Sequence, residues 1–129
     1  MSTDIVRYPT PLTAPLSRAV RAGGFLFLSG QTPKDENLQP LRGDIKTQAR
    51  NVLGAICETL NACGSNLSEV VRVTVWLSDI RLMGEFNEIY REYFCAALPT
   101  RSTVQATLAN DVDVEIEVQA WSPQGCRSA

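Results

Sequence analysis

Residues 112–121 read VDVEIEVQAW, a strict alternation of apolar and polar side chains. Because successive side chains of a strand point to opposite faces, this pattern predicts a strand with one apolar and one polar face. Residues 67–77 predict a second strand, in which positions 71–77 alternate in the same way, with valine or leucine at every odd position and Arg72, Thr74 and Trp76 between them. We expect the two apolar faces to be buried under a covering layer.

Two segments of the chain have the spacing of helices that could form this layer. In the first, Asp44 is a suitable N-cap, apolar residues recur at positions 45, 49, 52, 53, 56 and 60, and Gly64 stands where a left-handed C-cap residue is expected. In the second, Ser78–Asp79 precede an apolar stripe, and Pro99 marks the end of the segment. The stripe consists of Leu82, Phe86, Ile89, Tyr90 and Tyr93.

The N-terminal third of the chain is expected to be extended. Residues 7–16 contain three prolines and form a non-helical lead-in. Residues 18–21 and 25–29 bracket two glycines and predict a hairpin. The polar residues 32–42 contain two prolines and predict a surface loop.

We expect a further strand over residues 101–108, followed by a turn around Asn110–Asp111 that leads into the final strand. The predicted fold is therefore α/β, more closely α+β, with a mixed sheet of about six strands and two helices packed on one face. Two helices leave the other face uncovered. That face carries two tryptophans, Trp76 and Trp121, so we expect an oligomer in which another subunit covers it.

Composition narrows the classes of function. The chain has 129 residues, a net charge of -2 and no histidine, which removes the commonest general base and the commonest metal ligand. The four cysteines, Cys57, Cys63, Cys95 and Cys126, lack metal-site spacing and are expected to be reduced thiols of a cytosolic protein. The sequence has no pattern typical of a membrane span, a signal peptide, a nucleotide-binding loop or a basic tract for nucleic acid, and we expect none of these features. The two lysines, Lys34 and Lys46, lie in a loop and in a first helical turn, which disfavours Schiff-base chemistry.

Arg101 and Glu115 are the candidate catalytic residues. We expect them on neighbouring strands, where the guanidinium would bind a carboxylate bidentately and Glu115 would act as general base toward water. Residue pattern alone leaves two alternatives open: Arg101 could pair with an acid at a subunit boundary, and Glu117 lies on the same face as Glu115. Arg18, Arg21 and Arg72 are interpreted as structural or solvent-facing charges.

Several motifs occur together in order. They are PLSRAV (15–20), FLSGQTP (27–33), GD (43–44), QARN (48–51), VVRVTVWLSD (70–79), FNEIY (86–90), PTRSTV (99–104) and VEIE (114–117). On these residues the chain resembles the RidA/YjgF family, the reactive intermediate deaminases, over residues 12–121. The resemblance implies a single domain over residues 1–129 with short flexible termini. It also implies a chorismate-mutase-like fold and a homotrimer with an active site between subunits.

The resemblance assigns roles to the candidate residues. Arg101 matches the arginine that anchors the substrate carboxylate, and Glu115 matches the glutamate that positions water, which leaves Glu117 as structural. The resemblance also implies that six residues line the substrate pocket: Ser29, Gly30, Gln31, Thr103, Leu16 and Asn87. The main-chain N–H of Gly30 is expected to bind a substrate oxygen, since glycine permits close backbone approach.

Two of these positions depart from the family pattern. Leu16 stands where a pocket tyrosine is frequent, and Thr103 stands where a cysteine is frequent. The loss of the tyrosine hydroxyl makes the pocket entrance more apolar, which bears on the choice of substrate.

The implied activity is hydrolysis, without cofactor or metal, of 2-imino acids such as 2-iminobutanoate, or their enamine tautomers, to 2-oxoacids and ammonia. Two alternatives stay open: a 2-aminomuconate-type deaminase, and a trimer that binds 2-oxoacids or acts as a holdase without turnover. A ribonuclease is the least favoured, because histidine and a basic groove are absent.

Overall fold

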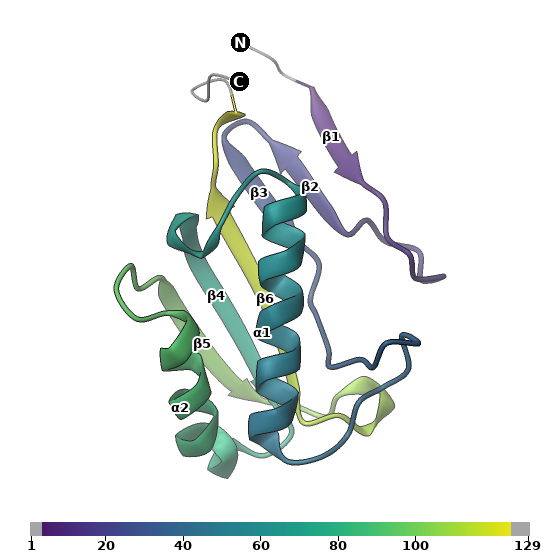
Figure 1. Cartoon of the computed structure of the whole chain (residues 1–129), viewed down its shortest axis with the longest axis vertical. Helices are drawn as coiled ribbons and strands as arrows, with labels where there is room; N and C mark the ends of the chain where they lie inside the picture. The colour runs from purple at the N-terminus through teal and green to yellow at the C-terminus, as the bar shows by residue number, and fades with distance from the viewer. Residues whose placement is uncertain (1–3, 125–129) are drawn as a thin grey trace.

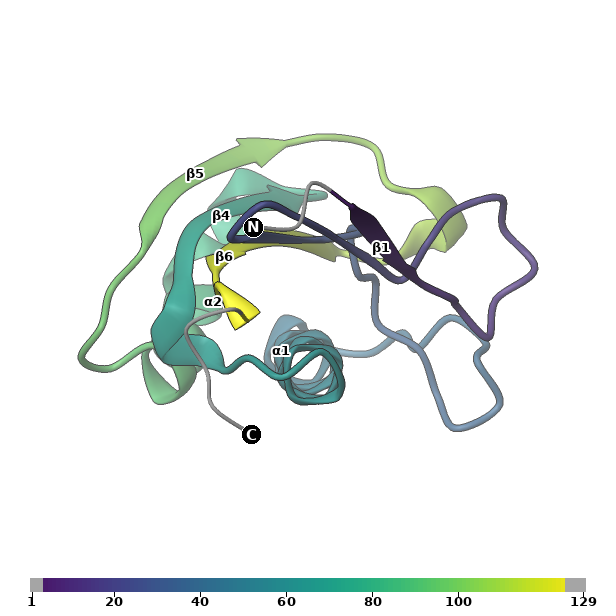
Figure 2. The ribbon, with the colours of Figure 1, turned by 90° about the horizontal axis from the view of Figure 1, so that it is seen from above.

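The computed structural model describes residues 4–124 and contains one six-stranded sheet in the order β1-β2-β3-β6-β4-β5. Helices α1 (Ile45–Ala62) and α2 (Met83–Tyr93) lie on the same side of this sheet (Figures 1 and 2). The strands are β1 (Ile5–Tyr8), β2 (Ala19–Ala22), β3 (Phe25–Leu28), β4 (Val70–Leu77), β5 (Thr100–Gln105) and β6 (Val114–Trp121). The predicted α+β class, with a mixed sheet and two helices on one face, is confirmed.

Strand β6 lies in the middle of the sheet. It pairs antiparallel with β3 on one side and with β4 on the other, while β4 and β5 run parallel and are joined through α2. The prediction that the strands of Arg101 and Glu115 are neighbours is therefore wrong, because β4 separates β5 from β6. The connection between β5 and β6 passes the end of β4 through a turn with positive φ at Asn110 and Asp111, rather than closing a hairpin.

Helix α1 forms as its pattern predicts. The Asp44 carboxylate accepts a hydrogen bond from the Thr47 N–H at 2.7 Å, and Gly64 follows the helix with a φ of +78°. The apolar stripe of α1 and the odd-numbered face of β4 from Val73 onward are buried in one core cluster with the apolar face of β6.

Some strand bounds and one strand register differ from the sequence prediction. Strand β1 forms from residue 5, partly within the segment expected to be a lead-in, because its backbone pairs with β2. Residues 67–69 form a short 3-10 helix capped by Asn66, so β4 begins only at Val70. A register shift between Val70 and Arg72 turns Val71 out of the core, and its side chain is 41% exposed.

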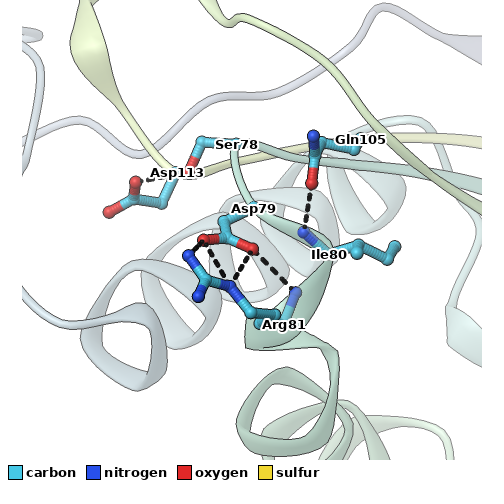
Figure 3. A network of polar contacts seen from close by, with 6 residues as sticks. All are labelled: Ser78, Asp79, Ile80, Arg81, Gln105 and Asp113. Carbon is cyan, nitrogen blue, oxygen red and sulfur yellow. Dashed lines mark hydrogen bonds and ion pairs between the residues drawn. The ribbon is translucent and has the colours of Figure 1, made fainter.

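A polar network ties the end of β4 to its neighbours (Figure 3). Ser78 donates its hydroxyl to Asp113 at 2.6 Å, next to β6, and the Ile80 N–H donates to the Gln105 side chain of β5 at 2.8 Å. Asp79 caps a 3-10 helix over Ile80–Leu82, from which α2 continues. The predicted helix therefore begins with a tighter first turn.

The sheet face opposite the helices carries exposed aromatic side chains. Phe25, Phe27 and Trp121 are 42%, 38% and 49% exposed, and the rings of Phe25 and Trp121 meet edge to face with centroids 5.0 Å apart. Trp76, Arg72 and Thr74 share this face, as predicted. An apolar surface of this kind is typical of an interface with another chain.

Residues 1–3 and 125–129, including Cys126 and the termini predicted to be flexible, lie outside the described residues. Within residues 4–124 the cysteines Cys57, Cys63 and Cys95 are free. In this same part of the chain, neither helix is long and apolar enough to cross a membrane.

Candidate functional site

A cavity of about 580 Å³ lies between α1 and the loops that flank β2 and β3. Four of the predicted substrate-binding residues, Leu16, Ser29, Gly30 and Gln31, line it together. Leu16 is 45% exposed and provides an apolar part of the wall. These predicted residues therefore converge, although they come from two separate loops.

The Ser29–Gln31 segment is fixed by hydrogen bonds to other parts of the chain. Ser29 donates its hydroxyl to the Ser17 carbonyl at 2.6 Å. Gln31 and Ile116 exchange both main-chain hydrogen bonds, at 2.8 and 3.0 Å, in a bridge beyond the end of β3. This bridge places Gly30 against β6.

Glu115 lies directly beside Gly30. A Cβ atom built on Gly30 would stand 2.4 Å from the Glu115 Oε2 atom, so only glycine leaves room for the carboxylate there. Burial raises the pKa of the Glu115 carboxyl, the charge of Glu117 raises it further, and the charge of Lys34 opposes both effects. A carboxylate with a raised pKa, held against a main-chain segment, is suited to act as a general base.

Arg101 lies in a second cluster, formed by β5 and α2. Its guanidinium carbon stands 4.6 Å from the ring centroid of Tyr90 and 5.5 Å from that of Phe86, and its Nε donates to the Thr103 hydroxyl at 2.8 Å. Burial lowers the pKa of the Arg101 guanidinium, which stays protonated because arginine titrates far above neutrality. Among residues 4–124, no carboxylate lies within 4.0 Å of this cation.

Two buried polar atoms of α2 lack hydrogen-bond partners in the described part of the chain. Within residues 4–124 the buried Asn87 Oδ1 atom has no hydrogen-bond partner, and neither does the buried Tyr90 hydroxyl. Burial raises the pKa of the Tyr90 hydroxyl, and the neighbouring Arg101 charge opposes this effect. Unsatisfied buried groups of this kind are rare, and they point to a ligand, a water or another chain. The structure therefore groups the predicted residues Asn87, Arg101 and Thr103 on one helix and its adjoining strand.

The two clusters are separate within one chain. In the sheet register Arg101 is level with Val73 of β4, on the helix side, whereas Glu115 is level with Trp76, on the opposite side. The expectation that a single pair of neighbouring strands brings them together is not met, because alternate residues of β4 point to opposite faces. One chain thus carries two half-sites, defined by Arg101 and by Glu115.

Sequence reasoning missed two cations in the wall of the cavity. Lys34, expected in a solvated loop, is half-buried, and its ammonium donates to the Thr32 hydroxyl at 2.8 Å. Arg18, interpreted as a structural or solvent-facing charge, also lines the cavity and donates its Nε to the Thr59 hydroxyl at 2.9 Å. Arg21 is structural, as interpreted: it is buried and donates to the Cys63 carbonyl at 2.6 Å and to the Ser122 carbonyl.

The residues between 4 and 124 contain no group of three His, Cys, Asp or Glu side chains able to hold a metal ion. The available polar chemistry of the two half-sites is therefore that of carboxylate, guanidinium, ammonium, hydroxyl and main-chain groups.

Comparison with known proteins gives consistent matches. The family model described as endoribonuclease L-PSP matches residues 9–122. A RutC family protein of Pyrococcus horikoshii is 43% identical over 115 residues, which cover 88% of this chain and 90% of that protein. The crystal structure of yeast Mmf1, a protein named as mitochondrial, has a TM-score of 0.87 at 32% identity and covers 92% of this chain and 99% of its own. A Yersinia pestis structure, described as a protein of unknown function of the conserved Rid protein family, has a TM-score of 0.82 at 33% identity, covering 89% of this chain and 93% of its own.

Proposed function

The chain belongs to the endoribonuclease L-PSP family, to which the YjgF and Rid proteins belong, and we propose that it hydrolyses 2-imino and 2-enamino acids to 2-oxoacids and ammonia. The observation that carries this proposal is the pair of half-sites. One presents an arginine that lies over two aromatic rings without a carboxylate partner, and the other presents a glutamate with a raised pKa. A cation for a substrate carboxylate and a base for water are the two groups that this hydrolysis needs.

The working unit in this proposal is a homotrimer with a site in each cleft between subunits. Because Arg101 and Glu115 face opposite sides of one sheet, a complete site takes Arg101 from one subunit and Glu115 from the next. Such a head-to-tail interface closes into a ring when each subunit repeats it. The exposed aromatic face of the sheet supplies apolar surface for the assembly. Residues 12–121 form the functional domain in this scheme.

The chemistry follows from these positions. The substrate carboxylate binds the Arg101 guanidinium of one subunit, and the Gly30 N–H of the next subunit donates to a substrate oxygen. Glu115 orients a water molecule and accepts its proton as the oxygen adds to the imine carbon. Glu115 passes that proton to the imine nitrogen, which gives the carbinolamine. Glu115 then moves the proton of the new hydroxyl to the nitrogen as the carbon–nitrogen bond breaks, so that ammonia leaves and the carbonyl of the 2-oxoacid forms. Positioning and charge stabilisation provide the acceleration.

An assay of imine hydrolysis tests this proposal. 2-Iminobutanoate is generated in situ by an amino acid oxidase, and its decay is followed with and without the protein. We expect Arg101→Ala to lose the acceleration, while Arg91→Ala, a matched exposed arginine on α2, keeps it. Equal activity of wild type and Arg101→Ala would refute the proposal.

A longer, more apolar acid of the 2-aminomuconate type is a second candidate substrate. The observation in its favour is the volume of the cavity, about 580 Å³, together with Leu16 in its wall. The ratio of turnover for this dicarboxylate to that for 2-iminobutanoate separates the two substrates. Tight 2-oxobutanoate binding in calorimetry, without hydrolysis of either imine, would instead indicate a binding protein.

Two further points belong to the proposal. Ribonuclease activity, which the family's description suggests, is assayed in the same preparations, and the proposal predicts none that depends on Arg101 or Glu115.

A cytosolic location is also proposed, and cell fractionation tests it against the mitochondrial location in the name of yeast Mmf1.

A further inference from the structure

The interior of the cavity beside Gly30 carries positive charge. Lys34 and Arg18 are half-buried there, and they donate to neutral groups: Lys34 to Thr32 and Arg18 to the Thr59 hydroxyl. The acids that line the same cavity, Asp35, Glu36 and Glu58, are all more exposed than these two cations. None of the ion pairs found within residues 4–124 involves Lys34 or Arg18.

Lys34 is held in a fixed position rather than in a mobile loop. Its N–H donates to the Asn51 Oδ1 atom at 2.9 Å, and its carbonyl accepts from the Asn51 Nδ2 atom at 2.7 Å. Both groups of the Asn51 amide are therefore used to fix this residue against α1. The Leu41 N–H also donates to the Pro33 carbonyl at 3.0 Å and closes the loop behind Lys34. A binding group is effective when its backbone is positioned in advance in this way.

Lys34 and Glu115 are near each other without forming an ion pair. Each charge influences the pKa of the other, but no nitrogen–oxygen distance between them falls within 4.0 Å. The other lysine, Lys46, does form such a pair, at 3.4 Å from Glu88. A half-buried ammonium without a close counter-ion gains stability when an anion binds beside it.

We propose that Lys34, with Arg18, binds the distal carboxylate of a dicarboxylic 2-imino acid, while the Arg101 half-site binds the carboxylate next to the imine. This proposal rests on the proposed function and names its substrate class. It assigns the two cations of the cavity to one end of the substrate and Arg101 to the other. The Glu115 carboxylate lies beside Gly30, a residue that lines the cavity, and would act on the carbon between the two ends.

Calorimetry with two product analogues tests the assignment. The probes are 2-oxoglutarate, which has a distal carboxylate, and 2-oxobutanoate, which lacks one. The wild-type protein is expected to bind 2-oxoglutarate about tenfold more tightly, a difference of roughly 1.4 kcal/mol for one charge-assisted contact. Lys34→Gln should lose this preference, Lys34→Arg should keep it, and Lys46→Gln, the matched variant of the other lysine, should leave it unchanged.

Other results would overturn either the distal-carboxylate site or the deaminase proposal. Equal affinities of the wild type for the two acids, or an unchanged preference in a folded Lys34→Gln protein, would overturn the distal-carboxylate site. An equal loss of affinity for both acids would also overturn it, since Lys34 would then act only through the charge of Glu115. The hydrolysis of 2-iminobutanoate and of 2-iminoglutarate, the imine of 2-oxoglutarate, is measured in parallel on the same proteins. If the wild type binds 2-oxoglutarate selectively but hydrolyses no imine, the deaminase proposal fails and the anion site stands.

Discussion

Replacing Gly30 by alanine should disable Glu115 without unfolding the protein. The added Cβ would lie 2.4 Å from the Glu115 Oε2 atom, whereas ordinary van der Waals contact begins near 3.4 Å. The carboxylate must therefore move by about 1 Å, and a displacement of that size costs roughly 10²-fold in rate when it separates a catalytic group from its substrate. The displaced atom is the end of a flexible side chain, so the free energy of unfolding should change little.

Gly84→Ala is the matched control. No heavy atom lies within 4 Å of a Cβ built on Gly84, which sits in α2. Alanine there should raise the free energy of unfolding by about 0.5–1 kcal/mol, because glycine loses more backbone entropy on folding. Its activity should equal that of the wild type.

The assay compares kcat for in situ 2-iminobutanoate with the urea midpoint of each protein. Gly30→Ala should lose activity with a nearly unchanged midpoint, and Gly84→Ala should show the reverse. Wild-type kcat in Gly30→Ala would refute the reasoning, because the carboxylate would have moved without consequence. A large loss of stability in Gly30→Ala would show that the contact with Glu115 is not the only one affected.

Burial raises the pKa of the Glu115 carboxyl, so kcat/KM should fall as the pH drops through a midpoint above the value usual for glutamate. Lys34→Met removes a charge that favours the ionised carboxylate and should therefore move this midpoint to higher pH. An unchanged midpoint in Lys34→Met would contradict this account. Arg21→Met should lower the free energy of unfolding by about 3 kcal/mol, because it leaves two buried carbonyls without their donor. Arg91→Met, at an exposed arginine, should change the free energy of unfolding by less than about 0.5 kcal/mol. Similar urea midpoints for the two variants would contradict the structural role of Arg21. Phe27→Asp, on the exposed aromatic face, should reduce the mass measured by light scattering toward that of the monomer, and an unchanged mass would place the interface elsewhere.

The local features of the fold follow from the sequence. The alternation over residues 112–121 predicts β6 and both of its faces, because burial on one face of a strand enforces a period of two. Asp44 and Gly64 predict the ends of α1 through the hydrogen bonds and backbone conformations that helix ends require. Val71 is the exception on β4, because a register shift is set by pairing with β6 and leaves no mark in the alternation.

Long-range pairing and the surroundings of single side chains are less accessible to sequence reasoning. The position of β6 between β3 and β4 depends on pairing across the whole chain, so strands consecutive in sequence need not be adjacent in space. Lys34 lies in a polar segment with two prolines that predicts a solvated loop. Its burial depends on Asn51, 17 residues away on α1, and no local pattern signals that contact. Arg101 and Glu115, which define the two half-sites, were predicted, but their separation onto opposite faces of the sheet was not.

Mixed oligomers test the composite site most directly. Chains carrying Arg101→Ala and chains carrying Glu115→Ala, each with its own affinity tag, are co-expressed, and oligomers containing both are purified by using the two tags in turn. In a trimer whose sites take Arg101 from one subunit and Glu115 from the next, every mixed trimer has a single intact site, so about one third of wild-type activity should return. Either variant alone should be inactive. Activity no higher than that of the separate variants would show that Arg101 and Glu115 do not complement each other across subunits, and it would contradict the proposed site.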